Sequence, residues 1–384
     1  MTITVVCDVL GEENNGTTIA AMNLIRFLKS QGHTVRILCG DQNKKGQENV
    51  YVVPNFNLGK LLNAYVKKVG VTLAKPVDNI IRKALKGSDA VHIMVPLPLG
   101  LATVKVAKEM NLPITAGFHM QAENLTCYLK LNKIKPINRL VYKFIWKHLY
   151  KYVDGIHYPT SFIKSIFEKN IKKQTPAYVI SNGVHDYVVK RQIDKPDNLK
   201  DKIVILTTGR YAREKSQDIL IKAIKLSKHK DKIQLILGGQ GVKEKQYKKI
   251  AKNLPIKPIF QFFSRTDIID VLNQCDIYAH PAEVELEGIS CIEAIACGKL
   301  TIVSDSKLSA TKEFAIDDKC IFKNRNPKSL AKVLDYWIDN EEERKIYEQK
   351  YLESSNVFNQ NECMKRMEQM ILEVINGKDK KQTA

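Results

Sequence analysis

Short apolar runs alternate with helix-length segments along the whole chain, and this alternation constrains the fold more than any other feature. The runs are apolar on both faces, as strands are inside a parallel sheet that helices cover on both sides. They lie at Ile3–Cys7, Val35–Cys39, Ala90–Val95, Ile114–Phe118, Gly155–Tyr158, Tyr178–Ser181, Ile203–Thr208, Gln234–Leu237, Ile259–Phe262, Ile277–His280 and Thr301–Ser304. Because the pattern occurs twice, we expect an α/β fold with two doubly wound, Rossmann-like domains.

A polar, weakly patterned stretch separates the two sets of runs. It predicts an N-terminal domain at residues 1–183, a linker at 184–201, a C-terminal domain at 202–355, and a C-terminal helix and tail at 356–384. Ligands of such folds bind beyond the carboxyl ends of the strands, where loops lead into helix N-termini. With two domains, the cleft between them is therefore the expected site.

Several classes of protein are disfavoured by the sequence. No run approaches the roughly 18 apolar residues of a membrane-spanning helix, and the first residues, MTITVVCDVLGEENNG, lack the basic start of a secretory signal. The eight cysteines include no Cys-x-x-Cys pair and no histidine at metal-ligand spacing. We therefore expect a cytoplasmic protein that uses no metal cofactor.

The formal net charge is +20 and is unevenly distributed. Residues 1–190 hold 26 of the 61 basic side chains but 12 of the 41 acidic ones, so this half is depleted in carboxylates. Such a surface suits a nucleic acid, an anionic membrane or an acidic substrate, and compositional drift is the alternative. Seven basic residues and one acid lie between Lys60 and Lys86, and seven basic residues and no acid lie between Asn124 and Val153.

The second of these segments has the pattern of an amphipathic helix. Its basic residues recur every four positions, at Arg139, Lys143, Lys147 and Lys151. A neighbouring row is aromatic, at Tyr142, Trp146 and Tyr150. The expected core-facing stripe is Val141, Phe144, Ile145, Leu149 and Tyr152. Lysines beside aromatic rings are typical of a helix in a lipid headgroup layer, so the basic row and Trp146 are expected to bind an anionic membrane. A solvated face with partly buried aromatics is the alternative.

Two loops have residues that could bind a phosphate. Gly16 stands where the first loop enters a helix, but that loop is not a Gly-x-Gly-x-x-Gly motif, and a structural turn glycine is the alternative. Farther along, a strand ends at Thr208, and Arg210 and Lys215 precede the next helix. Arginine offers a planar fork and lysine a point charge, which together suit a diphosphate.

The stretch 281–298 is the most informative part of the sequence. A helix is expected to begin at Ile289, and its first amides together with that of Gly288 form a donor-rich N-terminus. Three carboxylates lie around it, those of Glu285, Glu287 and Glu293. They gain from the positive helix end but repel one another, so a ligand rich in hydroxyl groups would satisfy them. Ordinary capping is the alternative.

Taken in order, these motifs resemble glycosyltransferase family 4. The resemblance rests on Gly209-Arg210 with Glu214-Lys215, and on Glu285 and Glu293, which seven residues separate and Ala-Ile-Ala-Cys-Gly follows. It continues through His280–Ala282, Ser181–Val184 and the first loop, and it covers essentially the whole chain. It implies a retaining, nucleotide-sugar-dependent enzyme of the GT-B fold, whose two Rossmann-like domains face an interdomain cleft. No Asp-x-Asp motif lies in the expected place, so no metal is expected to be required.

The resemblance implies a role for each matching residue. Arg210 and Lys215 would hold the donor diphosphate, with the Gly16 amide on its distal phosphate. Glu285 and the amides of Gly288, Ile289 and Ser290 would hold the donor sugar, and Glu293 would bind the ribose hydroxyls. Glu285 and His119 would be the catalytic residues. Glu287 departs from the family pattern but is also expected to bind the donor. His119 lies where the family places a histidine near the transferred sugar, and the base would lie near Gly239–Gly241 and Phe263–Arg265.

Two departures from the family pattern bear on the substrate. Asn15-Gly16 replaces paired glycines, which could alter entry of the acceptor, and Glu287 replaces an aromatic residue. The resulting Glu-x-Glu-Gly arrangement resembles the subgroup that glucosylates membrane diacylglycerol. We therefore expect a hexosyltransferase, peripherally attached to the inner face of the cell membrane, that uses UDP-glucose and a lipid such as diacylglycerol.

Two other functions stay open. One keeps the family but makes the acceptor a soluble or polymer-linked glycan. The other is a basic nucleic-acid-binding protein, which leaves the carboxylate cluster unexplained because acids repel a polyanion. The sequence predicts neither the linkage formed nor the oligomeric state.

Overall fold

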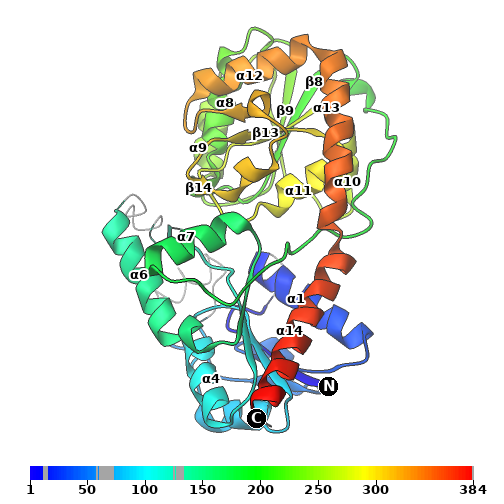
Figure 1. Ribbon diagram of the computed structural model, residues 1–384. Coiled ribbons are helices and arrows are strands. Elements are labelled where there is room, and N and C mark those ends of the chain that lie inside the picture. The colour runs from blue at the N-terminus through cyan, green and yellow to red at the C-terminus, as the bar shows by residue number, and fades with distance from the viewer. Residues whose placement is uncertain (12–15, 58, 60–72, 124–125, 127–133, 383–384) are drawn as a thin grey trace. The chain divides into compact units, whose positions relative to one another are not determined.

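The computed structural model describes residues 1–11, 16–57, 59, 73–123, 126 and 134–382 (Figure 1). The chain divides into two compact units. Unit 1 comprises Met1–Asn182 and Asn361–Ala384, and unit 2 comprises Gly183–Gln360. The C-terminal segment thus belongs to the same unit as the N-terminus, and the stretch 184–201 belongs to unit 2.

Unit 1 is built on a seven-stranded parallel sheet of order β3-β2-β1-β4-β5-β6-β7. Its strands are β1 (Thr2–Cys7), β2 (Thr34–Cys39), β3 (Val50–Val52), β4 (Ala90–Ile93), β5 (Ile114–Gly117), β6 (Gly155–Tyr158) and β7 (Ala177–Val179). Its helices are α1 (Gly16–Ser30), α3 (Asp78–Leu85), α4 (Pro98–Glu109), α6 (Lys135–His148), α7 (Ser161–Ile171) and α14 (Gln360–Gln382), with a 3-10 turn η2 (Tyr150–Tyr152) after α6. The strand order reverses between β1 and β4, which is the switch point where such folds bind ligands.

Helix α14 completes the core of unit 1 although it ends the chain. In Figure 1 it runs beside α1, and its buried side chains pack with those of α1, β1 and β2 in one apolar cluster. The α14 members of that cluster are Cys363, Met364, Met367, Met370, Ile371 and Ile375. His33 in unit 1 adds a 2.7 Å hydrogen bond to Glu368.

Unit 2 contains a six-stranded parallel sheet of order β10-β9-β8-β11-β13-β15 and a two-stranded pair, β12-β14. The strands are β8 (Ile203–Thr208), β9 (Ile233–Gly238), β10 (Ile259–Gln261), β11 (Ile277–His280), β12 (Val284–Glu285), β13 (Leu300–Ser304), β14 (Leu308–Ser309) and β15 (Ile321–Phe322). The helices are α8 (Gln217–Leu226), α9 (Glu244–Ala251), α10 (Asp267–Gln274), α11 (Ile289–Ala296), α12 (Pro327–Asp339) and α13 (Glu341–Ser354). Here the order reverses between β8 and β11, so the carboxyl ends of these two strands mark the switch point.

The expected fold class is confirmed, since both sheets are parallel and doubly wound. Every strand expected from an apolar run is present within two residues of its expected ends. The strands β3, β12, β14 and β15 were not expected, because runs of two or three residues are too short to show a pattern. Among the described residues, no helix is both long and apolar enough to cross a membrane.

The expected orientation of helix α6 was wrong in part: Ile145 and Leu149 are buried as expected, but the aromatic residues are not placed as expected. Tyr142 is buried and donates to Glu123 Oε2 at 2.5 Å, and Tyr150 is buried and donates to the carbonyl of Gly117 at 2.9 Å. Phe144, expected in the core, is 51% exposed. A buried tyrosine is stable when its hydroxyl finds a partner, and both partners come from distant parts of the fold that no local pattern reveals.

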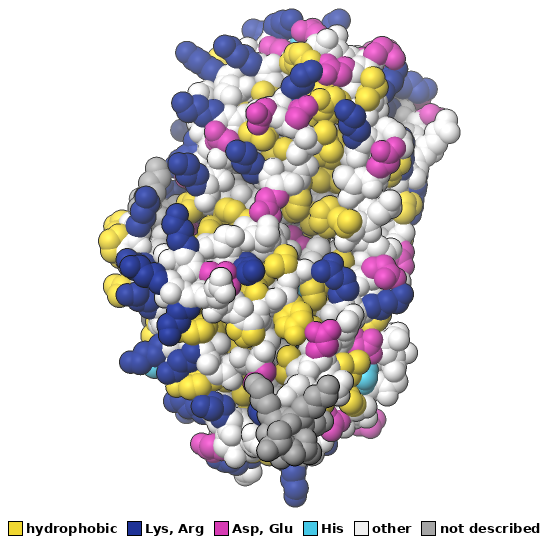
Figure 2. All heavy atoms as spheres, in the orientation of Figure 1, with side chains coloured by type: hydrophobic (Ala, Val, Ile, Leu, Met, Phe, Trp, Pro, Cys, Tyr) yellow, Lys and Arg dark blue, Asp and Glu magenta, His cyan; other side chains and the backbone are white. Residues whose placement is uncertain are grey.

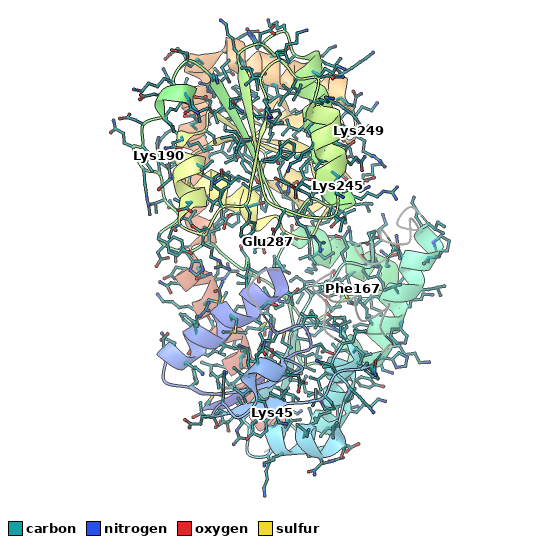
Figure 3. All side chains as sticks on the ribbon, turned by 180° about the vertical axis from the view of Figure 1, so that it is seen from behind. Lys45, Phe167, Lys190, Lys245, Lys249 and Glu287 are labelled. Atoms are coloured by element: carbon teal, nitrogen blue, oxygen red, sulfur yellow. The ribbon has the colours of Figure 1, made fainter. Side chains whose placement is uncertain are left out.

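The basic row of this helix is also interrupted. Helix α6 ends at His148, so Lys151 lies in the 3-10 turn that follows. Trp146 is partly buried, with its ring 6.3 Å from that of Phe167, which is labelled in Figure 3. Lys143 and Lys147 are exposed, whereas Arg139 is partly buried. The residues of the segments 60–86 and 124–153 that fall at 60–72, 124–125 and 127–133 lie outside the described residues.

Candidate active site

The carboxyl ends of β8 and β11 bring the expected cations and carboxylates of unit 2 together. Arg210 follows β8, and Lys215 ends the 3-10 turn that precedes α8. The backbone amide of Glu283, after β11, donates to the carbonyl of Glu214 at 2.8 Å, which joins the two loops. As a result Lys215 forms an ion pair with Glu285, which lies on β12.

A chain of hydrogen bonds leads from β8 to this ion pair. The hydroxyl groups of Thr208 and Tyr278 are 2.9 Å apart, and the Tyr278 hydroxyl lies 3.3 Å from Nδ1 of His280. The Nε2 atom of the same imidazole is 3.2 Å from Oε2 of Glu285, the oxygen that Lys215 also contacts. Because Tyr278 and His280 are nearly fully buried, the chain orients the Glu285 carboxylate from a rigid strand.

Two of the three carboxylates expected at the site, those of Glu285 and Glu293, have opposite pKa shifts. Burial alone would raise the pKa of Glu285, but the nearby Lys215 charge and the His280 hydrogen bond lower it to about 2. Burial raises the pKa of Glu293 to about 7, and the Arg265 charge opposes this rise. Glu285 is therefore a carboxylate at neutral pH, whereas Glu293 is present both as the carboxylate and as the protonated acid.

Helix α11 begins directly beside the ion pair. Its N-cap is Gly288, whose φ of +89° lies in the left-handed region. A Cβ atom there would lie 2.6 Å from Cγ2 of Thr311, so both the backbone and the space demand glycine. The amides of Ile289 and Ser290 begin the helix and have no carbonyl of the same helix to bind. Glu287 is buried just before this N-terminus, at the edge of unit 2 beside α11 (Figure 3).

Two neighbouring loops close the rest of this edge. A Cβ atom on Gly239 would lie 2.1 Å from the carbonyl oxygen of Gly209, so the loops after β9 and β8 approach as closely as backbones can. The Tyr211 amide donates to the Gln240 carbonyl at 2.9 Å. Arg210 donates to Glu214 at 2.9 Å while its side chain stays 49% exposed, so the guanidinium remains accessible to a ligand.

The expected residues of unit 1 lie at the carboxyl edge of the other sheet. Gly16 is the first residue of α1, exposed, with no described atom within 4 Å of a Cβ placed there. Residues 12–15 before it lie outside the described residues. Asp8, which was not singled out from the sequence, accepts from the amides of Leu99 at 2.9 Å and Gly100 at 3.2 Å, and so caps α4 at the switch point.

His119 lies two residues beyond β5, next to two more histidines. Its ring centroid is 5.2 Å from that of His157, and a Cβ atom on Gly117 would touch the same ring at 2.5 Å. Among the described residues, its Nε2 atom has no hydrogen-bond partner. Burial and the neighbouring histidines hold the pKa of His119 well below its usual value, so the imidazole is neutral.

The buried histidines of unit 1 predict a stability that falls in acid. Burial lowers the pKa of His92 to about 3, so unfolding, which restores an ordinary pKa of about 6.5, takes up a proton between these values. Below the ordinary pKa, His92 lowers the free energy of unfolding of the wild type by up to about 1.4 kcal/mol for each unit of decreasing pH. His92→Gln, which can keep a bond to Thr115, removes this contribution, so we expect its free energy of unfolding to fall less steeply in acid. Urea unfolding at pH 4 to 7 measures this difference, and parallel curves for the two proteins would contradict it.

The site was partly visible in the sequence. Arg210, Lys215, Glu285 and the N-terminus of α11 lie on one edge of unit 2, as expected, whereas Gly16 and His119 belong to unit 1. The roles of Tyr278 and Thr208 were missed. Tyr278 and His280 are polar residues at alternate positions of an apolar strand, and this spacing, which puts both on one face, was the available signal. Among the described residues, no group of three or more His, Cys, Asp or Glu side chains could hold a metal ion.

Two doubly wound parallel sheets, one with a cation–carboxylate site at its switch point, agree with the architecture that the sequence predicted. Two family models match it: Glycosyltransferase Family 4 over residues 14–186 and Glycosyl transferases group 1 over residues 188–352. The chain therefore belongs to glycosyltransferase family 4, and the expected family is confirmed.

Individual relatives are distant. Alpha-monoglucosyldiacylglycerol synthase of Streptococcus pneumoniae is 23% identical over 224 residues, which are 55% of this chain and 50% of that protein. The N,N'-diacetylbacillosaminyl-diphospho-undecaprenol alpha-1,3-N-acetylgalactosaminyltransferase of Campylobacter jejuni is 24% identical over 227 residues, 56% of this chain and 58% of that protein. The chain thus spans about half the length of these curated relatives. The solved structure of Anabaena HepE with UDP-glucose is 15% identical, with a TM-score of 0.74 over 98% of this chain and 100% of the other, and shows the shared fold.

Proposed function

We propose that this protein is a retaining glycosyltransferase that moves a hexose from a nucleotide sugar to a membrane lipid. The observation that carries the proposal is the Lys215–Glu285 ion pair beside the N-terminus of α11, with Arg210 on the adjoining loop. The site thus offers two cations for a diphosphate, and a carboxylate with free helix amides for a sugar.

These residues suit the breaking of a sugar–phosphate bond. As the bond between the anomeric carbon and the diphosphate oxygen lengthens, negative charge develops on that oxygen, and Arg210 and Lys215 stabilise it. An acceptor hydroxyl then bonds to the anomeric carbon from the same face, its proton passes to the leaving phosphate, and the anomeric configuration is kept. The ammonium of Lys215 has three protons, so it can donate to a phosphate while it keeps Glu285.

The other donor contacts are proposed in the same way. Glu293 would accept the ribose hydroxyls in its ionised form, Glu287 with the α11 N-terminus would line the sugar, and the Gly16 amide would meet the distal phosphate. His119, which is neutral, would contact the transferred sugar. We propose no metal requirement, because the two cations replace the charge that a metal ion would supply.

Glucose from UDP-glucose and diacylglycerol are the substrates we propose first. The Streptococcus pneumoniae relative is named for glucose and diacylglycerol, and the Anabaena structure with the same fold contains UDP-glucose. A lipid acceptor also fits the exposed face of α6, where Lys143 and Lys147 flank Leu140 and Phe144. We propose that this face attaches the protein peripherally to the inner face of the cell membrane.

Nucleotide release from UDP-glucose tests the function. We expect release of UDP that requires liposomes containing diacylglycerol, persists in EDTA, and is matched by glucose in the lipid fraction. Liposomes that lack diacylglycerol are the control. Release with a soluble glycan but not with liposomes would replace the proposed acceptor, and no release with any hexose donor would contradict the activity.

A further inference from the structure

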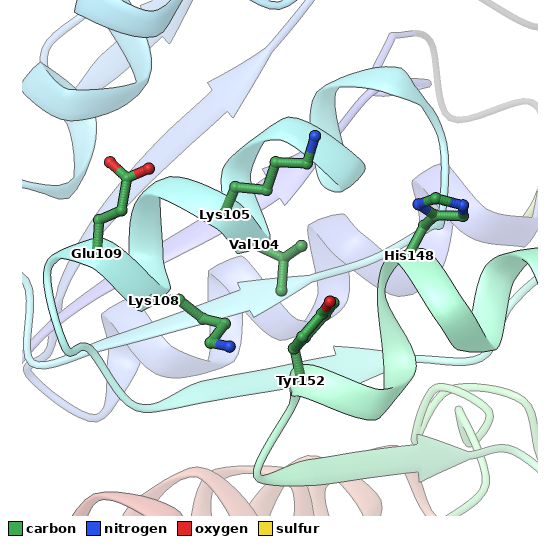
Figure 4. A pocket seen from close by; sticks show the side chains of 6 residues that line it. All are labelled: Val104, Lys105, Lys108, Glu109, His148 and Tyr152. Carbon is green, nitrogen blue, oxygen red and sulfur yellow. The ribbon is translucent and has the colours of Figure 1, made fainter.

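A cavity of about 420 Å³ lies in unit 1 between the last turns of α4 and the end of α6. Figure 4 shows its lining: Val104, Lys105, Lys108 and Glu109 come from α4, His148 ends α6, and Tyr152 ends the turn η2. None of these residues belongs to the sites described above. Val104 and the Tyr152 ring supply the apolar part of the lining, and Lys105, Lys108, Glu109 and His148 supply the polar part.

Two lysines, Lys108 and Lys151, lie over the Tyr152 ring that lines this cavity. Lys108 Nζ is 4.2 Å and Lys151 Nζ is 4.4 Å from the centroid of the Tyr152 ring. Lys105 lies one helical turn before Lys108, and all three lysines are exposed. A hydrogen bond with Lys151, and then the charges of Lys151, Lys108 and Lys105, lower the pKa of the Tyr152 hydroxyl. The ammonium groups of Lys108 and Lys151 over one ring repel each other, and a bound anion would relieve this repulsion.

The acid in the cavity does not neutralise these lysines. Glu109 forms its ion pair with Arg82, which also donates to Asp78 at 2.7 Å. Among the described residues, Lys105, Lys108 and Lys151 have no carboxylate within ion-pair distance. Lysines are also stabilised near the C-terminal end of a helix, but only by about 0.3–1 kcal/mol, and this effect does not explain a cavity beside them. The cluster therefore has the charge and the space for an anionic group.

The cavity adjoins the exposed apolar side of α6. The ring of His148 lies 4.5 Å from that of Phe144, which is 51% exposed, and Leu140 one turn before is 66% exposed. Figure 2 shows hydrophobic side chains beside Lys and Arg side chains along the edge of unit 1 where Figure 1 places α6. Cations next to protruding apolar side chains suit a phosphate at the level of lipid headgroups with acyl chains beside it.

We propose that the cavity between α4 and α6 binds the phosphate of an anionic phospholipid, while Leu140 and Phe144 enter the adjacent acyl region. Lys105 and Lys108, which line the cavity, and Lys151, which lies over the Tyr152 ring, supply the positive charge. His148 and Tyr152 line the same cavity and can form hydrogen bonds. The inference extends the membrane attachment in the proposed function by naming a headgroup site, and it is independent of the transfer chemistry.

Titration with a short-chain lipid distinguishes a specific headgroup site from non-specific electrostatic attraction. Dihexanoyl phosphatidylglycerol, below its micelle concentration, is titrated calorimetrically into the full chain, with dihexanoyl phosphatidylcholine and inorganic phosphate as separate probes. The expected result is saturable binding of the phosphatidylglycerol, absent with phosphatidylcholine and weaker with inorganic phosphate. Equal affinity for inorganic phosphate would identify a free phosphate as the ligand and overturn the proposal, as would no saturable binding.

A charge-matched pair of variants tests the location. Lys105→Gln/Lys108→Gln removes two lysines of the cavity, and Lys169→Gln/Lys173→Gln removes two exposed lysines elsewhere in unit 1. With vesicles of phosphatidylcholine and phosphatidylglycerol, we expect about 30-fold weaker binding for the first variant and less than about 3-fold for the second. Equal losses would show diffuse attraction and overturn the site. No nucleotide sugar is present, so failure of transfer and failure of this site are distinguishable.

Discussion

Lys215→Ala and Glu285→Ala are each expected to lower kcat for hexose transfer by about 100- to 1,000-fold or more, because we propose that both groups bind the donor where charge develops. Lys215 is proposed to stabilise the leaving diphosphate, and Glu285 is held as a carboxylate by Lys215 and His280. Steady-state rates with saturating UDP-glucose measure the effect. Lys249→Ala, an exposed lysine on α9 labelled in Figure 3, is the charge-matched control and should turn over normally.

We expect the losses of activity caused by the Lys215 and Glu285 substitutions to be non-additive. Because each partner loses its counter-charge when the other is removed, the double variant should be hardly slower than the worse single variant. Circular dichroism shows whether each variant is folded. Near-normal turnover of a folded Lys215→Ala or Glu285→Ala protein would remove these residues from the reaction, and fully additive losses would show that the ion pair does not act as a unit.

Removal of α14 is expected to unfold unit 1. Truncation before Asn361 deletes the apolar side chains that α14 adds to the cluster with α1, β1 and β2. Substitution of one such buried residue by alanine costs about 2–5 kcal/mol, and the whole domain is stable by about 5–15 kcal/mol. We therefore expect the truncated chain to be insoluble or to lose the urea transition of unit 1, followed by far-ultraviolet circular dichroism.

A single substitution tests the contribution of α14 to the core without the risk of aggregation. Ile371 is fully buried, so Ile371→Ala should lower the free energy of unfolding by about 2–5 kcal/mol. Gln369, on the exposed side of the same helix, is the control, and Gln369→Ala should change stability by less than about 0.5 kcal/mol. Equal stability of the two variants would contradict the role of α14 in the core.

The sequence predicted the strands of both large sheets except β3 and β15, because buried parallel strands have a one-dimensional signature, and Ile203–Thr208 shows it plainly. The buried face of α6 was predicted incorrectly at Tyr142 and Phe144 for a physical reason. Its periodicity allowed either Phe144 or Tyr142 to face the core, and Tyr142 does so because Glu123 accepts its hydroxyl. That acceptor depends on tertiary structure, which a local pattern does not contain.

In the candidate site, too, local sequence features were predicted and contacts that depend on tertiary structure were not. Arg210, Lys215 and Glu285 were singled out because charged residues near strand ends and helix N-termini are visible in sequence. The pairing of Lys215 with Glu285 was not, since 70 positions separate them and the contact depends on the order of β8 and β11 in the sheet. Asp8 was missed because its partners are backbone amides of α4, and any residue type supplies those.

The central claim is retaining transfer of a hexose to a membrane lipid, and the product made from UDP-[13C]glucose tests it most directly. The full chain is incubated with diacylglycerol liposomes, and the lipid extract is examined by nuclear magnetic resonance at the anomeric position. We expect 13C in the lipid fraction with the α configuration of the donor, and none with Glu285→Ala. A β-linked product, or label released only as free glucose, would contradict it.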